Sequence, residues 1–281
     1  MATTQLPSRR DGGADGRTTR ARASGPGGGE TSGDDRPTPR REVLLLLSFL
    51  AVYSLVRQLP SDDVSLALRN ARTVLGAERG LGLDVEARLN QAVAQLRWLE
   101  IATSYWYASL HYVVTPLVLV LLYRRRPDLY RPARTALGLA TATALLGYLL
   151  YPTAPPRLLP GYVDVLLDTS SAGWWSSEGS AVRGAAGLVN ELAAMPSMHV
   201  GWALWCGVVL AWTARHRWQQ ALGLFYPLVT TLVVLVTANH WTLDAVAGGG
   251  LVCTALVLVR ARSSAVSRSE EDPVPTPAGT T

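Results

Sequence analysis

Residues 239–260, NHWTLDAVAGGGLVCTALVLVR, join a short polar motif to an apolar run that carries no charge between Asp244 and Arg260. The part 243–260 approaches the ~20 apolar residues that a helix needs to cross a bilayer, so we predict a membrane-spanning helix there. At helical spacing, His240 and Asp244 lie on one face. The carboxylate can bind the proton of one ring nitrogen and leave the other nitrogen free as a nucleophile.

The rest of the chain repeats this apolar pattern. The mean hydropathy is +0.16 and 48% of the 281 residues are hydrophobic, although both ends are polar, and this is too apolar for an ordinary soluble enzyme. We predict five further spans, at 42–58, 101–123, 135–152, 199–214 and 219–238. The predicted fold class is all-α: an integral membrane six-helix bundle with disordered polar tails.

Composition separates two tails from the membrane domain. Residues 1–41 are rich in Arg and Gly, and residues 263–281 are rich in Ser, Glu and Pro. Both have few large apolar side chains, so we expect them to be disordered. The first tail is not followed by the apolar region and cleavage site of a signal peptide, so we predict no cleaved signal. The domain between the tails is 42–262.

Two parts of this domain connect the spans on one side. The segment 62–98 alternates charged and apolar residues, which is typical of amphipathic surface helices, with a break near Gly80–Gly82. The loop 152–198 carries Trp174 and Trp175, which suit the headgroup layer. Both parts fit either the border of a lipid entrance or ordinary packing at the membrane surface.

All 26 basic residues are arginine, which excludes a lysine nucleophile, a lysine Schiff base and a P-loop. With six spans, 18 arginines fall on one side of the membrane and eight on the other. The positive-inside rule then places both termini in the cytoplasm. We therefore predict a multi-pass protein of the cell (plasma) membrane that brings four polar residues together on the extracytoplasmic side: Arg157, Ser197, His199 and His240.

Three of these residues complement His240. Ser197 is a natural N-cap at the start of a predicted helix, where free backbone donors attract anions. His199 can give a proton to a departing oxygen and later remove one from an acceptor. Arg157 follows a proline-rich stop after the third span, and a guanidinium can hold phosphate through two hydrogen bonds. Alone, His199 fits a packed helix end and Arg157 a headgroup contact; together they favour phosphoryl transfer.

Other polar residues in the spans carry less information. His111 lies inside the second span, where an ionisable side chain is a functional hypothesis by default. It fits substrate binding and a bond to a neighbouring helix equally well. Cys206 and Cys253 lie in apolar segments and lack metal-ligand spacing. We predict neither a metal nor a cofactor, because the pair His199 and His240 has no third ligand at suitable spacing.

The motif Pro196-Ser197-x-His199 followed by His240-x-x-x-Asp244 resembles the phosphatidic acid phosphatase type 2 superfamily of membrane lipid phosphatases. The chain departs from the usual pattern of that superfamily, since it has no lysine and Val233-Val234 stands where a Ser-Arg pair is usual. These departures match one branch. YPTAPPR at 151–157 and AAMPSMH at 193–199 are similar to the inositol phosphorylceramide synthase group of inositolphosphotransferases and its bacterial relatives.

The resemblance covers about residues 43–260 and implies roles for particular side chains. It implies a six-helix bundle, a phosphohistidine at His240 and acid–base work by His199. It also implies phosphate binding by Arg157 and Ser197. Because valine replaces the usual arginine, Arg157 must bind more of the phosphate charge, and Asn190 is a candidate to assist.

The sequence thus predicts a lipid phosphotransferase or phosphatase acting on a lipid phosphate or phospholipid headgroup of the bilayer. The branch resemblance favours transfer to an alcohol such as inositol, whereas hydrolysis needs only water. The alternative is a non-catalytic membrane protein that binds or transports lipid phosphates, which would need Arg157 but not His240. We predict no nucleic-acid partner, because the arginines of the N-terminal tail are diluted by Gly and Asp and no aromatic residue lies among them.

Overall fold

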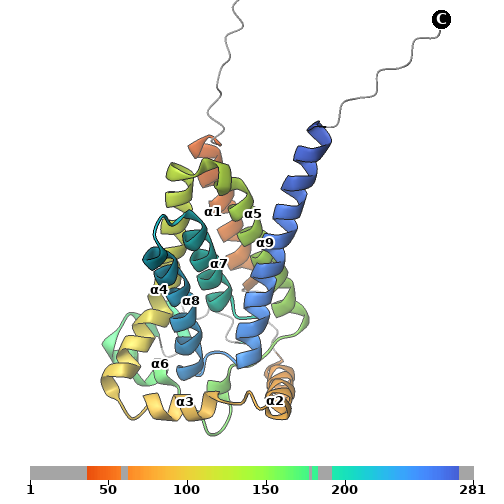
Figure 1. Cartoon of the computed structure of the whole chain (residues 1–281). Helices are drawn as coiled ribbons and strands as arrows, with labels where there is room; N and C mark the ends of the chain where they lie inside the picture. Colours follow the sequence, from red (N-terminus) through yellow and green to blue (C-terminus); the bar gives the residue numbers. More distant parts are fainter. Residues whose placement is uncertain (1–36, 58–62, 177–178, 183–191, 272–281) are drawn as a thin grey trace, which may run out of the picture. The chain divides into compact units, whose positions relative to one another are not determined.

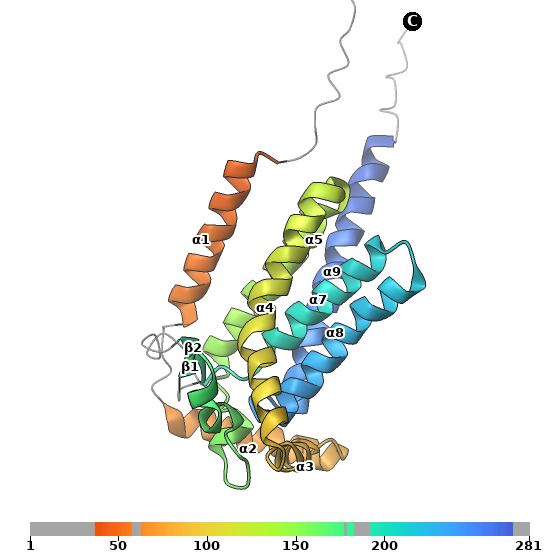
Figure 2. The same cartoon turned by 90° about the vertical axis from the view of Figure 1, so that its left-hand side faces the viewer.

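The computed structural model describes residues 37–57, 63–176, 179–182 and 192–271, all of which lie within one compact unit, Asp35–Thr281. The long helices of this unit run in roughly the same direction (Figures 1 and 2). They are α1 Pro39–Arg57, α4 Arg97–Arg125, α5 Pro127–Leu150, α7 Met198–Thr213, α8 Arg217–Val236 and α9 Thr242–Glu271.

Among the described residues, four helices are long and apolar enough to cross a membrane. These are α4, α5, α8 and the part Thr242–Ala265 of α9, which match the spans predicted second, third, fifth and sixth. Helix α7 is apolar but has only 16 residues. Helix α1 has 19 residues with charged side chains at both ends. The chain is therefore a helical membrane protein, and the count of six spans stays a prediction.

A second group of elements lies across one end of these helices, away from the start of α1 and the end of α9 (Figure 1). It contains α2 Val64–Leu81 and α3 Glu86–Val93, in the segment where we predict amphipathic helices. The break between them falls at Gly82, whose φ of +67° is a left-handed helix cap that favours glycine. The short helix α6 Val165–Asp168 and the 3₁₀ turns η1 Pro156–Leu158 and η2 Ser170–Ala172 are part of this group.

The all-α prediction misses one small feature. Strands β1 Trp175–Ser176 and β2 Gly179–Val182 pair as an antiparallel ribbon. Trp175 is fully buried beside α6, where its indole N–H donates to the Leu166 carbonyl. The ribbon is too short to give a repeating sequence pattern.

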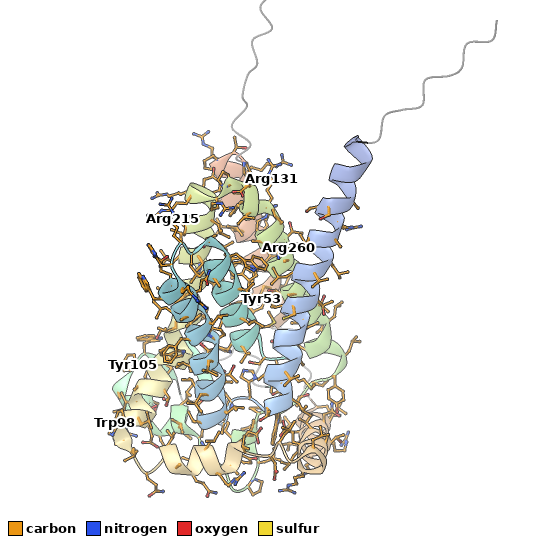
Figure 3. The ribbon with its side chains drawn as sticks, in the orientation of Figure 1. Tyr53, Trp98, Tyr105, Arg131, Arg215 and Arg260 are labelled. Atoms are coloured by element: carbon orange, nitrogen blue, oxygen red, sulfur yellow. The ribbon has the colours of Figure 1, made fainter. Side chains whose placement is uncertain are left out.

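Labelled side chains mark the two ends of the bundle. Figure 3 shows Arg131 and Arg215 near the end where α1 begins, and Trp98 at the opposite end, near α3. The described chain both starts and stops at the arginine-bearing end, because α1 begins there and α9 ends there.

Glycines let α7 approach α8 and α9 closely. A Cβ atom on Gly207 would lie 2.5 Å from the Gly223 carbonyl oxygen of α8. A Cβ atom on Gly248 of α9 would lie 2.0 Å from the carbonyl oxygen of Ser197, just before α7. Small residues at such crossings allow backbones to touch. The start of α7 is thus fixed directly against α9.

Candidate active site

His240 lies in the turn between α8 and α9, two residues before α9 begins. Helix α8 ends at Val236, and Ala238 then takes a left-handed φ of 52°. The backbone N–H groups of Asn239 and His240 both donate to the Val234 carbonyl, at 3.1 and 3.3 Å. His240 therefore lies outside the helix, because α9 starts only at Thr242, but the predicted contact between His240 and Asp244 is present.

The His240 ring has two oxygen atoms near its Nδ1 atom. The Ala194 carbonyl oxygen lies 2.8 Å from Nδ1, and Asp244 Oδ2 lies 3.6 Å from it. The same Oδ2 accepts the backbone N–H of Trp241 at 2.9 Å. Both oxygens favour a proton on Nδ1, so Nε2 keeps its lone pair. Nε2 is buried and has no hydrogen-bond partner in the described part of the chain.

His199 stands beside His240 at the start of α7. The two ring centroids are 5.6 Å apart, although the two histidines are 41 positions apart in sequence. Tyr107 of α4 stacks on the His199 ring, with centroids 4.2 Å apart and planes 20° apart. His111, one turn further along α4, contacts the same ring edge-on at 4.4 Å. Helix α4 thus packs two side chains against the His199 ring, and these contacts orient the ring.

Ser197 links the two histidine-bearing segments. It is fully buried and caps α7, since its side chain accepts the backbone N–H of Val200. Its own backbone N–H donates to the Asp244 carbonyl at 2.9 Å. Together with the close approach at Gly248, this bond places the free N–H end of α7 next to the first turn of α9.

Arg157 lies in the turn η1, close to the His240 segment in space. Its backbone N–H donates to the carbonyl of Ala238, two residues before His240, at 2.9 Å. The guanidinium is only 4% exposed, and its Nε lies 3.4 Å from Asp164 Oδ2. Asp164 also caps α6 by accepting the N–H of Leu167. The backbone of Arg157 thus lies against the His240 turn, and its buried cation lies beside a carboxylate.

The structure places some of the remaining candidate residues and does not describe others. His111 is buried, and the contacts given above place it beside His199. Asn190 lies outside the described residues. Within the described ranges there is no group of three His, Cys, Asp or Glu residues that could hold a metal ion. Cys206 is buried and Cys253 is exposed.

Five residues of this region were not predicted from the sequence: Glu78, Glu86, Tyr107, Ala194 and Asp164. Ala194 acts through its backbone carbonyl, so no side-chain pattern can reveal it. Tyr107 and His111 are four residues apart in a predicted span, and that spacing was a usable signal. The three acids lie in segments that look like ordinary solvated surface. Only the fold shows that Glu78 and Glu86 are buried.

Comparison with known proteins gives the family. The family model described as the PAP2 superfamily matches residues 72–258, which is more than half of the chain. The protein therefore belongs to the PAP2 superfamily. No curated protein and no solved structure matches the chain. The matched range contains Arg157, Ser197, His199, His240 and Asp244, and the family membership indicates a membrane phosphatase or phosphotransferase.

Proposed function

We propose that this protein is a lipid phosphotransferase or lipid phosphate phosphatase that works through a phosphohistidine at His240. The observation that carries the proposal is the placement of His240 Nε2. This atom is buried, has no partner among the described residues, and belongs to a ring 5.6 Å from His199. A nucleophile with an adjacent acid–base group is the arrangement that covalent phosphoryl transfer needs.

In the first step, Nε2 of His240 attacks phosphorus opposite the ester oxygen. The N–P bond forms, the P–O bond breaks, and protonated His199 gives its proton to the departing lipid alcohol. The His240 ring gains positive charge in this step. The Ala194 carbonyl and the Asp244 carboxylate, both near Nδ1, stabilise that charge.

In the second step, neutral His199 removes a proton from water or from an alcohol hydroxyl. The resulting oxygen attacks phosphorus, the P–N bond breaks, and the electron pair returns to Nε2. Water yields inorganic phosphate or a phosphomonoester, and an alcohol such as inositol yields a new phosphate ester. The branch resemblance of the motifs at 151–157 and 193–199 supports an alcohol as acceptor.

Arg157 and Ser197 are the proposed phosphate-binding residues. The backbone of Arg157 is hydrogen-bonded to the turn that carries His240, and the first N–H groups of α7 follow Ser197. Cations and helix N-termini both stabilise the charge on the phosphate oxygens. His111 and Asn190 are further proposed substrate contacts.

We also propose that the site faces the extracytoplasmic side of the cell membrane, with six spans and both termini in the cytoplasm. Arg131 and Arg215 near one end of the bundle support this orientation (Figure 3). Under the positive-inside rule this end is cytoplasmic. The surface helices α2 and α3, whose acids contact the start of α9, then lie on the outer face.

The test uses full-length protein in lipid nanodiscs with a panel of lipid phosphates and phospholipids, with and without inositol. Wild type, His240→Ala and His216→Ala are compared, because His216 is an exposed histidine at the start of α8. We expect activity in wild type and His216→Ala and none in His240→Ala. A substrate labelled on phosphorus should leave an acid-labile, base-stable label on His240.

Each outcome of this test has a distinct reading. Phosphate release that needs His240 but no alcohol indicates a phosphatase, and an alcohol-linked product without free phosphate indicates a transferase. Equal inactivity of wild type and His240→Ala on the whole panel would overturn the proposal. Retained lipid-phosphate binding that depends on Arg157 would then indicate a binding or transport protein.

A further inference from the structure

Helices α2 and α3 each bury one carboxylate against the start of α9. Glu78 of α2 is 0% exposed and Glu86 of α3 is 1% exposed. Fully buried glutamates are rare unless they are paired. Glu78 Oε1 accepts the backbone N–H of Leu243 at 2.8 Å. Glu86 Oε1 accepts the backbone N–H of Thr242 at 2.7 Å and the hydroxyl of the same residue.

These hydrogen bonds involve residues that closely follow His240 in the chain. Asp244 Oδ2 accepts the N–H of Trp241, so three successive N–H groups after His240 each have a carboxyl oxygen as partner. The first N–H groups of a helix have no partner within the helix. The first turn of α9 is therefore held by α2 and α3 as well as by its own Asp244.

Helix α3 makes a second connection to the same region. Asn90, one turn after Glu86, donates to the carbonyl of Val236, the last residue of α8, at 2.9 Å. It also exchanges hydrogen bonds with the backbone of Val163, at 2.7 and 3.0 Å. Val163 precedes Asp164, the partner of Arg157. One short helix thus contacts both ends of the His240 turn and the loop that orients the arginine.

The acid cluster is also sensitive to pH. Burial raises the pKa of Glu78 to about 8, and repulsion by Glu86 and Asp244 acts in the same direction against the Leu243 hydrogen bond. At neutral pH Glu78 therefore keeps its proton. The charged and titratable groups around Glu78 are Glu86 of α3, Asp244 of α9 and Tyr162, whose own environment includes Arg79 and Asp84.

We propose that Glu78 and Glu86 are positioning residues for His240. Through them the surface helices α2 and α3 hold the turn between α8 and α9, so that the His240 ring stays against the Ala194 carbonyl with Nε2 directed at phosphorus. This role rests on the proposed function of His240. Loss of the Glu78 proton adds negative charge beside Glu86 and Asp244, loosens the first turn of α9 and lowers the rate of phosphoryl transfer.

The first test needs no substrate. Full-length wild type, Glu78→Gln and Glu86→Gln are treated with diethyl pyrocarbonate between pH 7 and 9.5, and modification of each histidine is followed by peptide mass spectrometry. Exposed His216 is the reference within each sample. We expect the rate at His240, relative to His216, to rise about tenfold through pH 8 in wild type. Glu78→Gln, which keeps an acceptor but cannot ionise, should lack this rise.

The matched control is Glu100→Gln. Glu100 is also a buried carboxylate, 5% exposed, but it lies on α4 and pairs with Arg97 rather than with α9. Its substitution should leave the pH dependence at His240 as in wild type. The proposal is overturned if Glu78→Gln keeps the wild-type rise, or if Glu100→Gln removes the rise equally. Should Glu78→Gln fail to fold, Glu86→Gln must raise the His240 rate at neutral pH.

The second test is the pH profile of turnover on the lipid phosphate that wild type uses. We expect kcat of wild type to fall above pH 8, and this alkaline decrease to disappear in Glu78→Gln. Glu78→Ala, which loses the acceptor, should lower kcat about tenfold with KM changed less than twofold. An unaltered alkaline decrease in Glu78→Gln would contradict the proposal. An inactive wild type would refute the proposed function, whereas the modification rates would still test the positioning role.

Discussion

His240 Nδ1 and the carbonyl oxygen of Ala194 lie 2.8 Å apart, although 46 residues separate them in the chain. This contact is shorter than the 3.6 Å between Nδ1 and Asp244 Oδ2. A backbone carbonyl only accepts hydrogen bonds, so it requires a proton on Nδ1. The tautomer with a free Nε2 is therefore set mainly by Ala194, while Asp244 adds negative charge and caps the start of α9.

This geometry separates the roles of His240 and Asp244. We expect His240→Ala to abolish turnover, with a loss of at least about 10³-fold. Asp244→Asn should lose only about 10- to 100-fold, or about 1.4–2.7 kcal/mol of transition-state stabilisation, because the Ala194 carbonyl still fixes the ring. Steady-state kinetics on one lipid phosphate measures both. Equal losses in the two variants would show that Asp244, rather than Ala194, controls the ring.

The acid role of His199 depends on the leaving group. We expect His199→Asn to lower kcat for a lipid alkyl phosphate by about 10²- to 10⁴-fold. With an aryl phosphate, whose leaving oxygen needs no proton, His199→Asn should recover most of the wild-type rate of the first step. Burst kinetics with a nitrophenyl ester measures that step. If the first-step rate of His199→Asn did not recover with the nitrophenyl ester, His199 would be excluded as the acid. The control is His240→Ala, which lacks the nucleophile and should stay inactive on this ester.

Gly248 allows α7 to reach α9. A methyl group there would lie 2.0 Å from the Ser197 carbonyl oxygen, which is closer than real Cβ contacts. We expect Gly248→Ala to destabilise the protein by about 1–3 kcal/mol and to lower activity by shifting His199. Thermal unfolding in detergent measures the first effect. Gly250→Ala is the matched control, because a Cβ atom at Gly250 has nothing within 4 Å.

Glu78 should make stability depend on pH. Its pKa in the folded state is about 8, above the ordinary value of 4.5, because the carboxyl is buried. Between these values the folded state holds a proton that the unfolded chain has released. The contribution of Glu78 to stability is therefore fully present below pH 4.5 and is lost as the pH rises to about 8.

The measurement is the unfolding midpoint of wild type and Glu78→Gln from pH 5 to 9. We expect the wild-type midpoint to fall relative to that of Glu78→Gln as the pH rises to about 8. Above pH 8 the difference between the two midpoints should stay constant. Parallel curves over the whole range would show that Glu78 is already ionised at pH 5. Glu100→Gln again controls for loss of a buried carboxylate on another helix.

Much of the membrane domain was predictable from local sequence. The apolar runs at 101–123 and 243–260 fall within helices able to cross a bilayer, and those at 135–152 and 219–238 overlap two more, which end two residues earlier than predicted. Apolar length is a local property, because every residue in a membrane must satisfy its backbone within its own helix. The ribbon at Trp175 was not predicted, since tertiary contacts decide it.

The candidate residues for the chemistry could be chosen from local sequence. Two histidines, a serine at a helix start and an arginine after a proline-rich stop were all recognisable from residue type and spacing, and the family match includes them. Only the tertiary structure decided how they are held. The Ala194 carbonyl, the stacked ring of Tyr107 and the buried acids Glu78 and Glu86 act across long sequence separations. Backbone acceptors and burial leave no local pattern, because both exist only once the helices have packed.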